Sequence, residues 1–341
     1  MTDLPRLDEI IDRLHVVALP LRVQFRGIKV REAALIEGPC GWGEFAPFAE
    51  YQPPETSAWL ASALESAFCE LPAPQRQWVE VNATIPAVAP ELVPDLVARY
   101  PGCRTFKVKV AEHGQTLADD CARVAEVRRE VPGAIIRVDA NRGWSVAEAV
   151  AAAENLGELD YLEQPCYSVS ELVQLREELR SRGISTRVAA DESIRRSDDP
   201  YGIAQSKAAD VAVLKVPPLG GVRRMLHIAQ HLHAHQMHVT VASALDTGVG
   251  LYPGLLAAAN QPVLQEGRYP AAGLATQELF LEDIVPPLEL SDGYVPVIRQ
   301  TPEPERLAEF RGTPTQREHW IQRISAAYAR LNEMSSIPRD L

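Results

Sequence analysis

Five runs of β-favouring residues in this chain each end in a lysine or an acid. The runs are KVKV, RVDAN, LEQP, AADES and VLKVP, which carry Lys107 with Lys109, then Asp139, Glu163, Asp191 and Lys215. Three carboxylates that converge repel one another unless a cation holds them, and an all-oxygen ligand set suits a hard ion. Imidazole and thiolate ligands are missing from these segments, which disfavours zinc. The residue types therefore predict a Mg²⁺ site, with Mn²⁺ as the alternative ion.

The spacing of the acids supports the same site. Asp139 and Glu163 are 24 residues apart, and Asp191 follows after a further 28. Each interval fits one β-strand and one helix, so each acid would end a different strand. In a barrel of parallel strands, side chains at the carboxyl ends of the strands face the active-site mouth. We therefore expect the three acids to meet there.

The lysines on either side of the acids suggest proton transfer. A lysine at its reference pKa of about 10.4 is a poor base at neutral pH, but neighbouring positive charge lowers that pKa. Lys107 and Lys109 are two residues apart on a strand and would point the same way. Removing a proton next to a carboxylate creates an enediolate, which needs strong electrostatic stabilisation. A metal, three acids and a lysine base form one unit for that chemistry.

The order of predicted elements indicates an α/β protein with two parts. Residues 1–78 contain two segments of alternating polarity, 15–23 and 27–37, a loop at 38–48 and a helix at 55–70, which predicts an α+β domain. Residues 79–285 alternate short strands with helices, as in a β/α barrel. The predicted barrel strands are 79–83, 105–110, 134–139, 161–163, 186–191, 211–215, 239–242 and 263–265. The predicted helices include 116–131, 145–156, 169–182 and 221–234.

Two further features complete the organisation. Residues 286–341 are rich in loops and end in a helix near 315–334, which we expect to pack against one of the domains. No GxGxxG motif opens the first β/α unit, so a dinucleotide-binding sheet is the weaker alternative.

The composition of the chain limits the classes of partner that the protein is expected to bind. The 341 residues carry a formal net charge of -12, which argues against a nucleic-acid partner because phosphate binding needs a basic surface. A small anionic carboxylate can still bind if a metal and lysines reverse the charge locally. No apolar run is long enough to span a membrane, and the N-terminus lacks a signal-like pattern. The five scattered cysteines favour reduced thiols, so we expect a cytoplasmic protein without membrane partners.

The strand-end motifs KVK, DAN, EQP, DES and LK resemble those of the muconate-lactonising subgroup of the enolase superfamily over nearly the whole chain. The resemblance implies a modified (β/α)7β barrel of the TIM type with an α+β capping domain, to which the C-terminal segment returns. It also implies that Asp139, Glu163 and Asp191 bind Mg²⁺, with Lys109 and Lys215 as an acid/base pair on opposite faces of the substrate. The mandelate-racemase subgroup is disfavoured because it places a catalytic histidine at the end of strand seven, where this chain has residues 242–245 with the sequence ASAL. His238 falls at the opposite end of that strand.

Within that subgroup the chain is similar to a family of dehydratases of menaquinone synthesis, particularly its actinobacterial type. The motifs of this likeness are FRG, GWGEFAPF, RVDANRGW, KVPPLGG and SALDTGVGL. The implied reaction is syn elimination of water from 2-succinyl-6-hydroxy-2,4-cyclohexadiene-1-carboxylate, giving 2-succinylbenzoate. Lys109 would remove the ring proton and return it to the departing hydroxyl, while Lys215 would act as a cation against the ring. The likeness also suggests substrate contacts or supporting roles for Lys107, Arg26, Ser243, Arg137 and Asn141.

Several other functions fit the same residues. An N-acylamino-acid racemase or dipeptide epimerase would use both lysines to exchange protons, and a muconate cycloisomerase would use the same scaffold. A Schiff-base aldolase would use Lys215 without a metal. A non-catalytic metal-binding protein would keep the acids but gives no reason for the lysine pair.

Overall fold

The N-terminal part of the protein is built on a small antiparallel sheet. The computed structural model describes residues 4–25, 27–197, 199–264 and 267–336. The sheet consists of β1 (Leu14–Phe25), β2 (Ile28–Gly38) and β3 (Gly41–Phe45), and it is accompanied by α1 (Leu7–Asp12) and α2 (Glu55–Phe68). The burial of β2 departs from the predicted alternation, because residues 33–36 are all buried and the two faces of the strand pack into different apolar clusters. Most residues of α2 are buried as well. Residue 26, a predicted substrate contact as Arg26, lies outside the described residues.

The prediction of a loop over residues 38–48 is wrong in part. Its middle part forms β3, which pairs with β2. The two glycines of this strand hide its polarity pattern from the sequence. Gly43 is required by packing, because a β-carbon there would overlap the carbonyl oxygen of Ala63 on α2.

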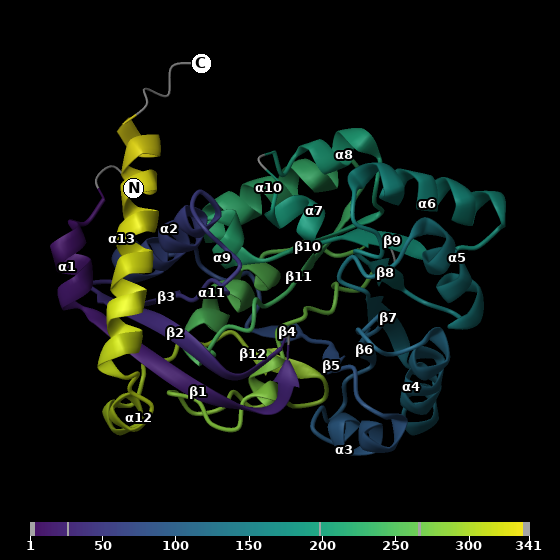
Figure 1. The fold of residues 1–341 in the computed structure, drawn as a ribbon, viewed down its shortest axis with the longest axis horizontal. Helices are drawn as coiled ribbons and strands as arrows, with labels where there is room; N and C mark the ends of the chain where they lie inside the picture. The colour runs from purple at the N-terminus through teal and green to yellow at the C-terminus, as the bar shows by residue number, and fades with distance from the viewer. Residues whose placement is uncertain (1–3, 26, 198, 265–266, 337–341) are drawn as a thin grey trace.

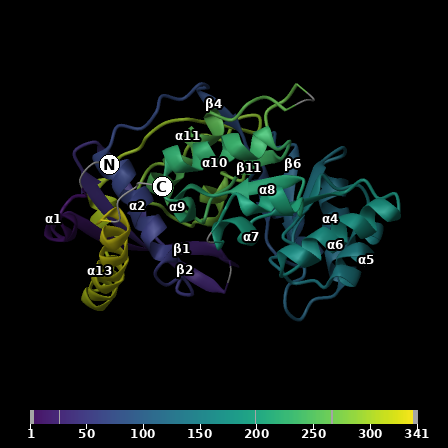
Figure 2. The ribbon, with the colours of Figure 1, turned by 90° about the horizontal axis from the view of Figure 1, so that it is seen from above.

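A parallel sheet with helices on its outside forms the larger part of the protein (Figures 1 and 2). Its seven strands run in the order β11-β10-β9-β8-β7-β6-β5. Their bounds are β5 (Ala83–Ile85), β6 (Thr105–Lys109), β7 (Ile135–Asp139), β8 (Tyr161–Glu163), β9 (Arg187–Ala190), β10 (Val211–Leu214) and β11 (His238–Val241). The helices after the strands are η1 (Pro90–Leu92), α3 (Val93–Val97), α4 (Leu117–Glu130), α5 (Val146–Asn155), α6 (Val169–Ser181), α7 (Glu192–Arg195), α8 (Gly202–Ser206), α9 (Val216–Leu219), α10 (Val222–Ala234), α11 (Gly248–Ala259) and η2 (Thr276–Leu279).

The helix starts follow from local sequence. Three helices begin with a hydroxyl residue, Thr116, Ser145 or Ser168, whose side chain accepts a hydrogen bond from the backbone N–H three residues later. The acidic side chain at that later position accepts a hydrogen bond from the backbone N–H of the hydroxyl residue. These three capping boxes begin α4, α5 and α6 close to their predicted positions. The helices and the sheet enclose one large apolar core that includes Phe106, Leu162 and Leu255.

Both ends of the barrel sheet differ from the sequence prediction. The predicted first strand, 79–83, is displaced: β4 (Trp78–Glu80) pairs instead with β12 (Tyr294–Pro296), and the barrel begins at β5. The predicted last strand, 263–265, is also wrong for Val263 and Leu264, which are not in a strand, while residue 265 lies outside the described part. Parallel bridges from Val81 to Ala272 and from Ala242 to Gly273 occupy the eighth position instead. The fold is a TIM-type barrel sheet with a capping domain, as predicted.

The C-terminal segment packs on the capping domain. After α12 (Pro304–Glu309), the long helix α13 (Pro314–Ser336) lies against α2 and β1 (Figure 1). Its Trp320 and Ile324 are buried in one cluster with Phe45 and Trp59. The helix thus completes the capping-domain core, although the boundaries predicted at residues 78 and 285 remain predictions.

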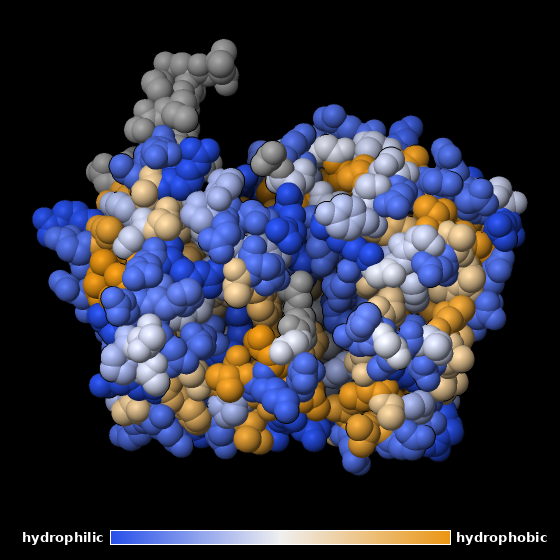
Figure 3. Space-filling view, viewed as in Figure 1, coloured by the Kyte–Doolittle hydropathy of each residue, from blue (hydrophilic) through white to orange (hydrophobic). Residues whose placement is uncertain are grey.

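The face shown in Figure 3 is mostly hydrophilic, with small hydrophobic groups between the polar residues. Within the described ranges, no helix has the length and apolar character needed to cross a membrane.

Candidate active site

Three of the predicted site residues lie in one row across neighbouring strands. In the parallel register, Lys109 on β6 pairs with Asp139 on β7, which in turn pairs with Glu163 on β8. Paired residues of adjacent strands point to the same face of a sheet. Asp191 and Lys215 directly follow β9 and β10. The sheet therefore brings all five side chains to its carboxyl edge.

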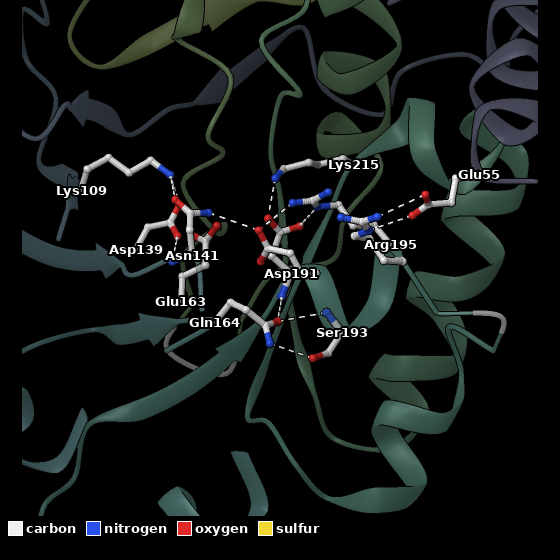
Figure 4. A network of polar contacts seen from close by, with 12 residues as sticks. Glu55, Lys109, Asp139, Asn141, Glu163, Gln164, Asp191, Ser193, Arg195 and Lys215 are labelled. Carbon is white, nitrogen blue, oxygen red and sulfur yellow. Dashed lines mark hydrogen bonds and ion pairs between the residues drawn. The ribbon is translucent and has the colours of Figure 1, made fainter. Parts of the chain in front are cut away.

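The two lysines reach the carboxylates from opposite sides (Figure 4). The Nζ atom of Lys109 lies 2.5 Å from Oδ2 of Asp139, and it also donates to Oδ1 of Asn141. The Nζ atom of Lys215 lies 2.6 Å from Oδ2 of Asp191. Glu163 lies between the two aspartates in the strand order. The two lysines thus flank the three acids, whereas the predicted meeting of the acids around one cation stays a prediction.

Lys107 pairs with two of the acids. Its Nζ donates to both oxygens of Glu163, at 3.1 and 3.2 Å, and lies 3.6 Å from Asp139. Burial alone would lower the pKa of Lys107, but the charges of Glu163 and Asp139 outweigh it and raise that pKa. Lys107 is therefore a fixed positive charge beneath the acids.

The three acids are in unequal electrostatic environments. Burial and the neighbouring charge of Asp139 raise the pKa of Glu163 to about 7. Burial also raises the pKa of Asp191 to about 6, although Lys215 opposes this shift. For Asp139, burial is outweighed by Lys109 and Lys107, which hold its pKa below the ordinary value. Burial also lowers the pKa of Lys215, although the charge of Asp191 opposes this shift.

The acids fit a hard divalent cation by their chemistry. Asp139, Glu163 and Asp191 are 2%, 0% and 1% exposed, and buried carboxylates need compensating charge. Among the described residues, no group of three or more acidic, histidine or cysteine side chains is placed so that it could hold a metal ion as it stands. Lysine amines pair with the carboxylates instead, and Lys107 is the donor to Glu163. The donor set is all-oxygen, which suits Mg²⁺ or Mn²⁺ better than zinc.

Sequence reasoning missed several residues that support the acids. Oε1 of the buried Gln164 accepts from the backbone N–H groups of Asp191 and Ser193, at 3.0 Å each. Arg195 donates to Oδ1 of Asp191 at 2.8 Å and to Glu192 at 2.7 Å. Their positions offered a signal: Gln164 directly follows Glu163, and Arg195 is one helical turn after Asp191.

A small pocket opens beside these residues. The barrel contributes Thr84, Lys107, Lys109, Asp139, Asn141, Arg195, Lys215, Ser243, Ala244, Leu245, Gly273 and Thr276, and the capping domain contributes Phe25 and Phe48. The predicted residues Asn141 and Ser243 thus line the pocket. The Nζ atom of Lys109 lies 5.6 Å from the centre of the Phe25 ring, so the cap covers this lysine.

Arg137 does not line this pocket. Its side chain donates to Asp160 at 2.8 Å, to Asn82 at 3.1 Å and to the carbonyl of Ala271 at 2.7 Å, and it lines a separate small cavity. That cavity also includes His238, the first residue of β11, so it lies toward the amino ends of the strands. Arg137 therefore acts below the acids, where it holds the barrel interior together.

The family models divide the chain in the same way as the structure. The description "Enolase N-terminal domain-like" matches residues 16–67, and "Enolase C-terminal domain-like" matches residues 91–302. Proteins of this fold family generally use a divalent metal. Among solved structures, the muconate lactonizing enzyme from Pseudomonas putida has a TM-score of 0.69 at 21% identity and covers 88% of this chain and 98% of its own. An N-succinyl Arg/Lys racemase from Bacillus cereus has a TM-score of 0.71 at 18% identity, with coverage of 88% and 97%.

The sequence relatives are much more similar. The o-succinylbenzoate synthase of Mycolicibacterium smegmatis is 53% identical over 328 residues, which are 95% of this chain and 98% of the relative. The o-succinylbenzoate synthase of Mycobacterium tuberculosis is 52% identical over 331 residues, with coverage of 96% and 97%. The chain therefore belongs to the enolase superfamily and, within it, to the o-succinylbenzoate synthase family.

Proposed function

We propose that this protein is an o-succinylbenzoate synthase, a hydro-lyase of menaquinone biosynthesis. It would convert 2-succinyl-6-hydroxy-2,4-cyclohexadiene-1-carboxylate into 2-succinylbenzoate and water. One observation carries the proposal: three buried acids from consecutive strands lie between Lys109 and Lys215, beside a covered pocket. The relatives that share about half of the sequence over nearly its whole length bear the same name.

The charge of the site supports a divalent cation. The three acids are matched by Lys107, Lys109 and Lys215, and Arg195 is paired with Glu192. A substrate with two carboxylates brings two further negative charges into this buried region, and a divalent cation would offset them. We propose Mg²⁺, held by Asp139, Glu163 and Asp191, with Mn²⁺ as the alternative. When bound, the cation would supply positive charge against the substrate carboxylate as its α-proton leaves.

The protein's own residues would perform the proton transfers. The neutral amine of Lys109 takes the ring proton next to the carboxylate, which leaves an enediolate. The resulting ammonium group returns that proton to the departing hydroxyl, so that the carbon–oxygen bond breaks, water leaves and the ring becomes aromatic. Lys215, on the other side of the acids, provides a positive charge against the ring. Asn141, which accepts a hydrogen bond from Lys109, would orient its amine.

The direct test is the reaction itself. The cyclohexadiene substrate loses its ultraviolet absorbance as the product forms, and mass spectrometry identifies 2-succinylbenzoate. Activity is expected with Mg²⁺, absent after EDTA treatment and restored by added Mg²⁺. Absence of dehydration by metal-loaded protein would overturn the proposal.

A second candidate is an N-succinylamino-acid racemase. The lysines on opposite sides of the acids favour it, because racemisation needs one base on each face of the substrate carbon. Deuterium incorporation from heavy water into both enantiomers of an N-succinyl amino acid would reveal it. An aldolase that uses Lys215 would be revealed by borohydride trapping without metal.

A cytoplasmic location is also proposed. All five cysteines are free thiols, which suits a reducing compartment. The net charge of -12 supports a small-molecule partner rather than nucleic acid.

A further inference from the structure

One buried arginine joins the capping domain to the barrel beside the pocket. Arg31 lies on β2 and is 2% exposed. Its Nε donates to the carbonyl of Leu245 at 2.9 Å, and one of its Nη atoms reaches the carbonyls of Ala46 and Ala244. A guanidinium group has a fixed planar fork of donors, so it can hold carbonyls of two domains in one geometry.

The same guanidinium group also supports an aromatic wall. Its carbon atom lies 4.2 Å from the centre of the Phe48 ring. Phe48, Ala244 and Leu245 all line the pocket, whereas Arg31 does not. Any effect of Arg31 on a pocket ligand must therefore pass through these neighbours.

The loop after β11 depends on this support. Leu245 has a φ of +63°, a left-handed conformation that costs an L-residue about 1–2 kcal/mol. Asp246 accepts hydrogen bonds from Ser243 and from the N–H of Ala244, and Glu44 on β3 accepts from Thr247. Arg31 donates hydrogen bonds to the carbonyl of this strained residue, Leu245, and to the carbonyl of the preceding residue, Ala244. The capping domain thus sets the shape of this part of the pocket.

We propose that Arg31 is a positioning residue for recognition of the substrate's succinyl group. The inference rests on the proposed function. The acids and lysines of β6 to β10 occupy one part of the pocket and suit the ring carboxylate. Phe48 and the loop of Ala244 and Leu245 form the remaining wall, against which the succinyl chain lies. Arg31 fixes both sides of that wall relative to each other.

Binding of two related carboxylates separates this role from general stability. With Mg²⁺-loaded protein, calorimetry gives the affinities for 2-succinylbenzoate and for benzoate, which lacks the succinyl group. Arg31→Met keeps an unbranched side chain as far as the position of Nε but removes the guanidinium donors and the charge. The variant should lower the affinity for 2-succinylbenzoate about tenfold or more, equivalent to about 1.4 kcal/mol. Its affinity for benzoate should stay within about twofold of the wild-type value. Arg31→Lys should show a smaller loss of the same selectivity.

Arg76 offers a matched control. It too clamps backbone carbonyls, those of Ala258 and Gln261, but away from the pocket. Arg76→Met should leave both affinities unchanged even if it lowers the melting temperature. If Arg31→Met does not fold, Arg31→Lys carries the test.

The inference would be overturned if the Arg31 variants lowered the affinities for both ligands equally, or lowered neither affinity. Wild-type protein that binds benzoate but gains nothing from the succinyl group would overturn the proposed function as well. The two failures are therefore distinguishable in the wild-type measurement.

Discussion

Lys107 donates to both carboxylate oxygens of Glu163, at 3.1 and 3.2 Å, with both side chains buried beneath the pocket. The two residues belong to β6 and β8, with β7 between them, so the pair ties three strands together. A buried pair of this kind adds little net stability, but the loss of one partner leaves an uncompensated charge. Lys107 therefore has a structural role through its pairing with Glu163.

Lys107→Met should destabilise the metal-free protein by about 3–5 kcal/mol, because Glu163 would lose its hydrogen-bond donor in a dry environment. Urea unfolding in EDTA measures this loss. The exposed Lys29→Met serves as the control and should change stability by less than about 0.5 kcal/mol. A Lys107 variant as stable as this control would contradict the buried-pair account.

Arg195→Lys should weaken Mg²⁺ binding. Arg195 fixes Oδ1 of Asp191 and also holds Glu192, and a lysine cannot reproduce both bonds. Loss of a group that orients a metal ligand typically lowers metal affinity about 10–100-fold. Calorimetric titration with Mg²⁺ measures the change. The neighbouring Arg196, which pairs with Glu55, gives the control Arg196→Lys, and equal affinities in the two variants would refute the assigned role.

The pH dependence of stability should depend on Glu44. Burial and the charge of Asp246 raise the pKa of Glu44 to about 8, against about 4.3 in an unfolded chain. The folded state thus binds a proton more tightly than the unfolded state, so this stabilising contribution is complete below about pH 4 and is lost as the pH rises to about 8.

Glu44→Gln should remove that contribution. The stability difference, wild type minus variant, should therefore fall between about pH 5 and pH 8 when thermal unfolding is followed in EDTA. The exposed Glu289→Gln should show a flat difference over the same range. A difference that rises with pH for Glu44→Gln would show that the carboxylate is stabilised in its charged form instead.

The lysines and acids of the candidate active site could be predicted because their residue types and their positions were both distinctive. Lysines and acids at the ends of β-favouring runs are unusual, and parallel topology forces such ends to one edge of the sheet. The register of Lys109, Asp139 and Glu163 follows from that topology. The capping boxes at Thr116, Ser145 and Ser168 similarly fixed the helix starts because their signal is local.

The barrel closure could not be predicted because its signal is not local. Ala272 and Gly273 occupy the eighth position through single bridges, and small residues carry no strand pattern. Val263 and its neighbours looked more strand-like by composition. Likewise, strand alternation places Arg137 on the same face as Asp139, but only the structure shows that its side chain turns down to Asp160.

The residues that form the pocket walls could not be predicted from the sequence either. Thr84, Gly273 and Thr276 are ordinary residues that line the pocket because strands distant in sequence meet there. The contribution of Arg31 depends on contacts with residues more than 200 positions away. No periodicity or motif encodes such a contact between domains.

The central claim is that Lys109 is the base of a metal-dependent proton abstraction. Its most direct test is the kcat of Lys109→Met with the cyclohexadiene substrate at saturating Mg²⁺, compared with the exposed-lysine control Lys207→Met. Loss of a general base is expected to lower kcat about 10²–10⁴-fold while Mg²⁺ still binds, and the control should retain wild-type activity. A Lys109→Met enzyme that keeps kcat within about threefold of wild type would contradict the account.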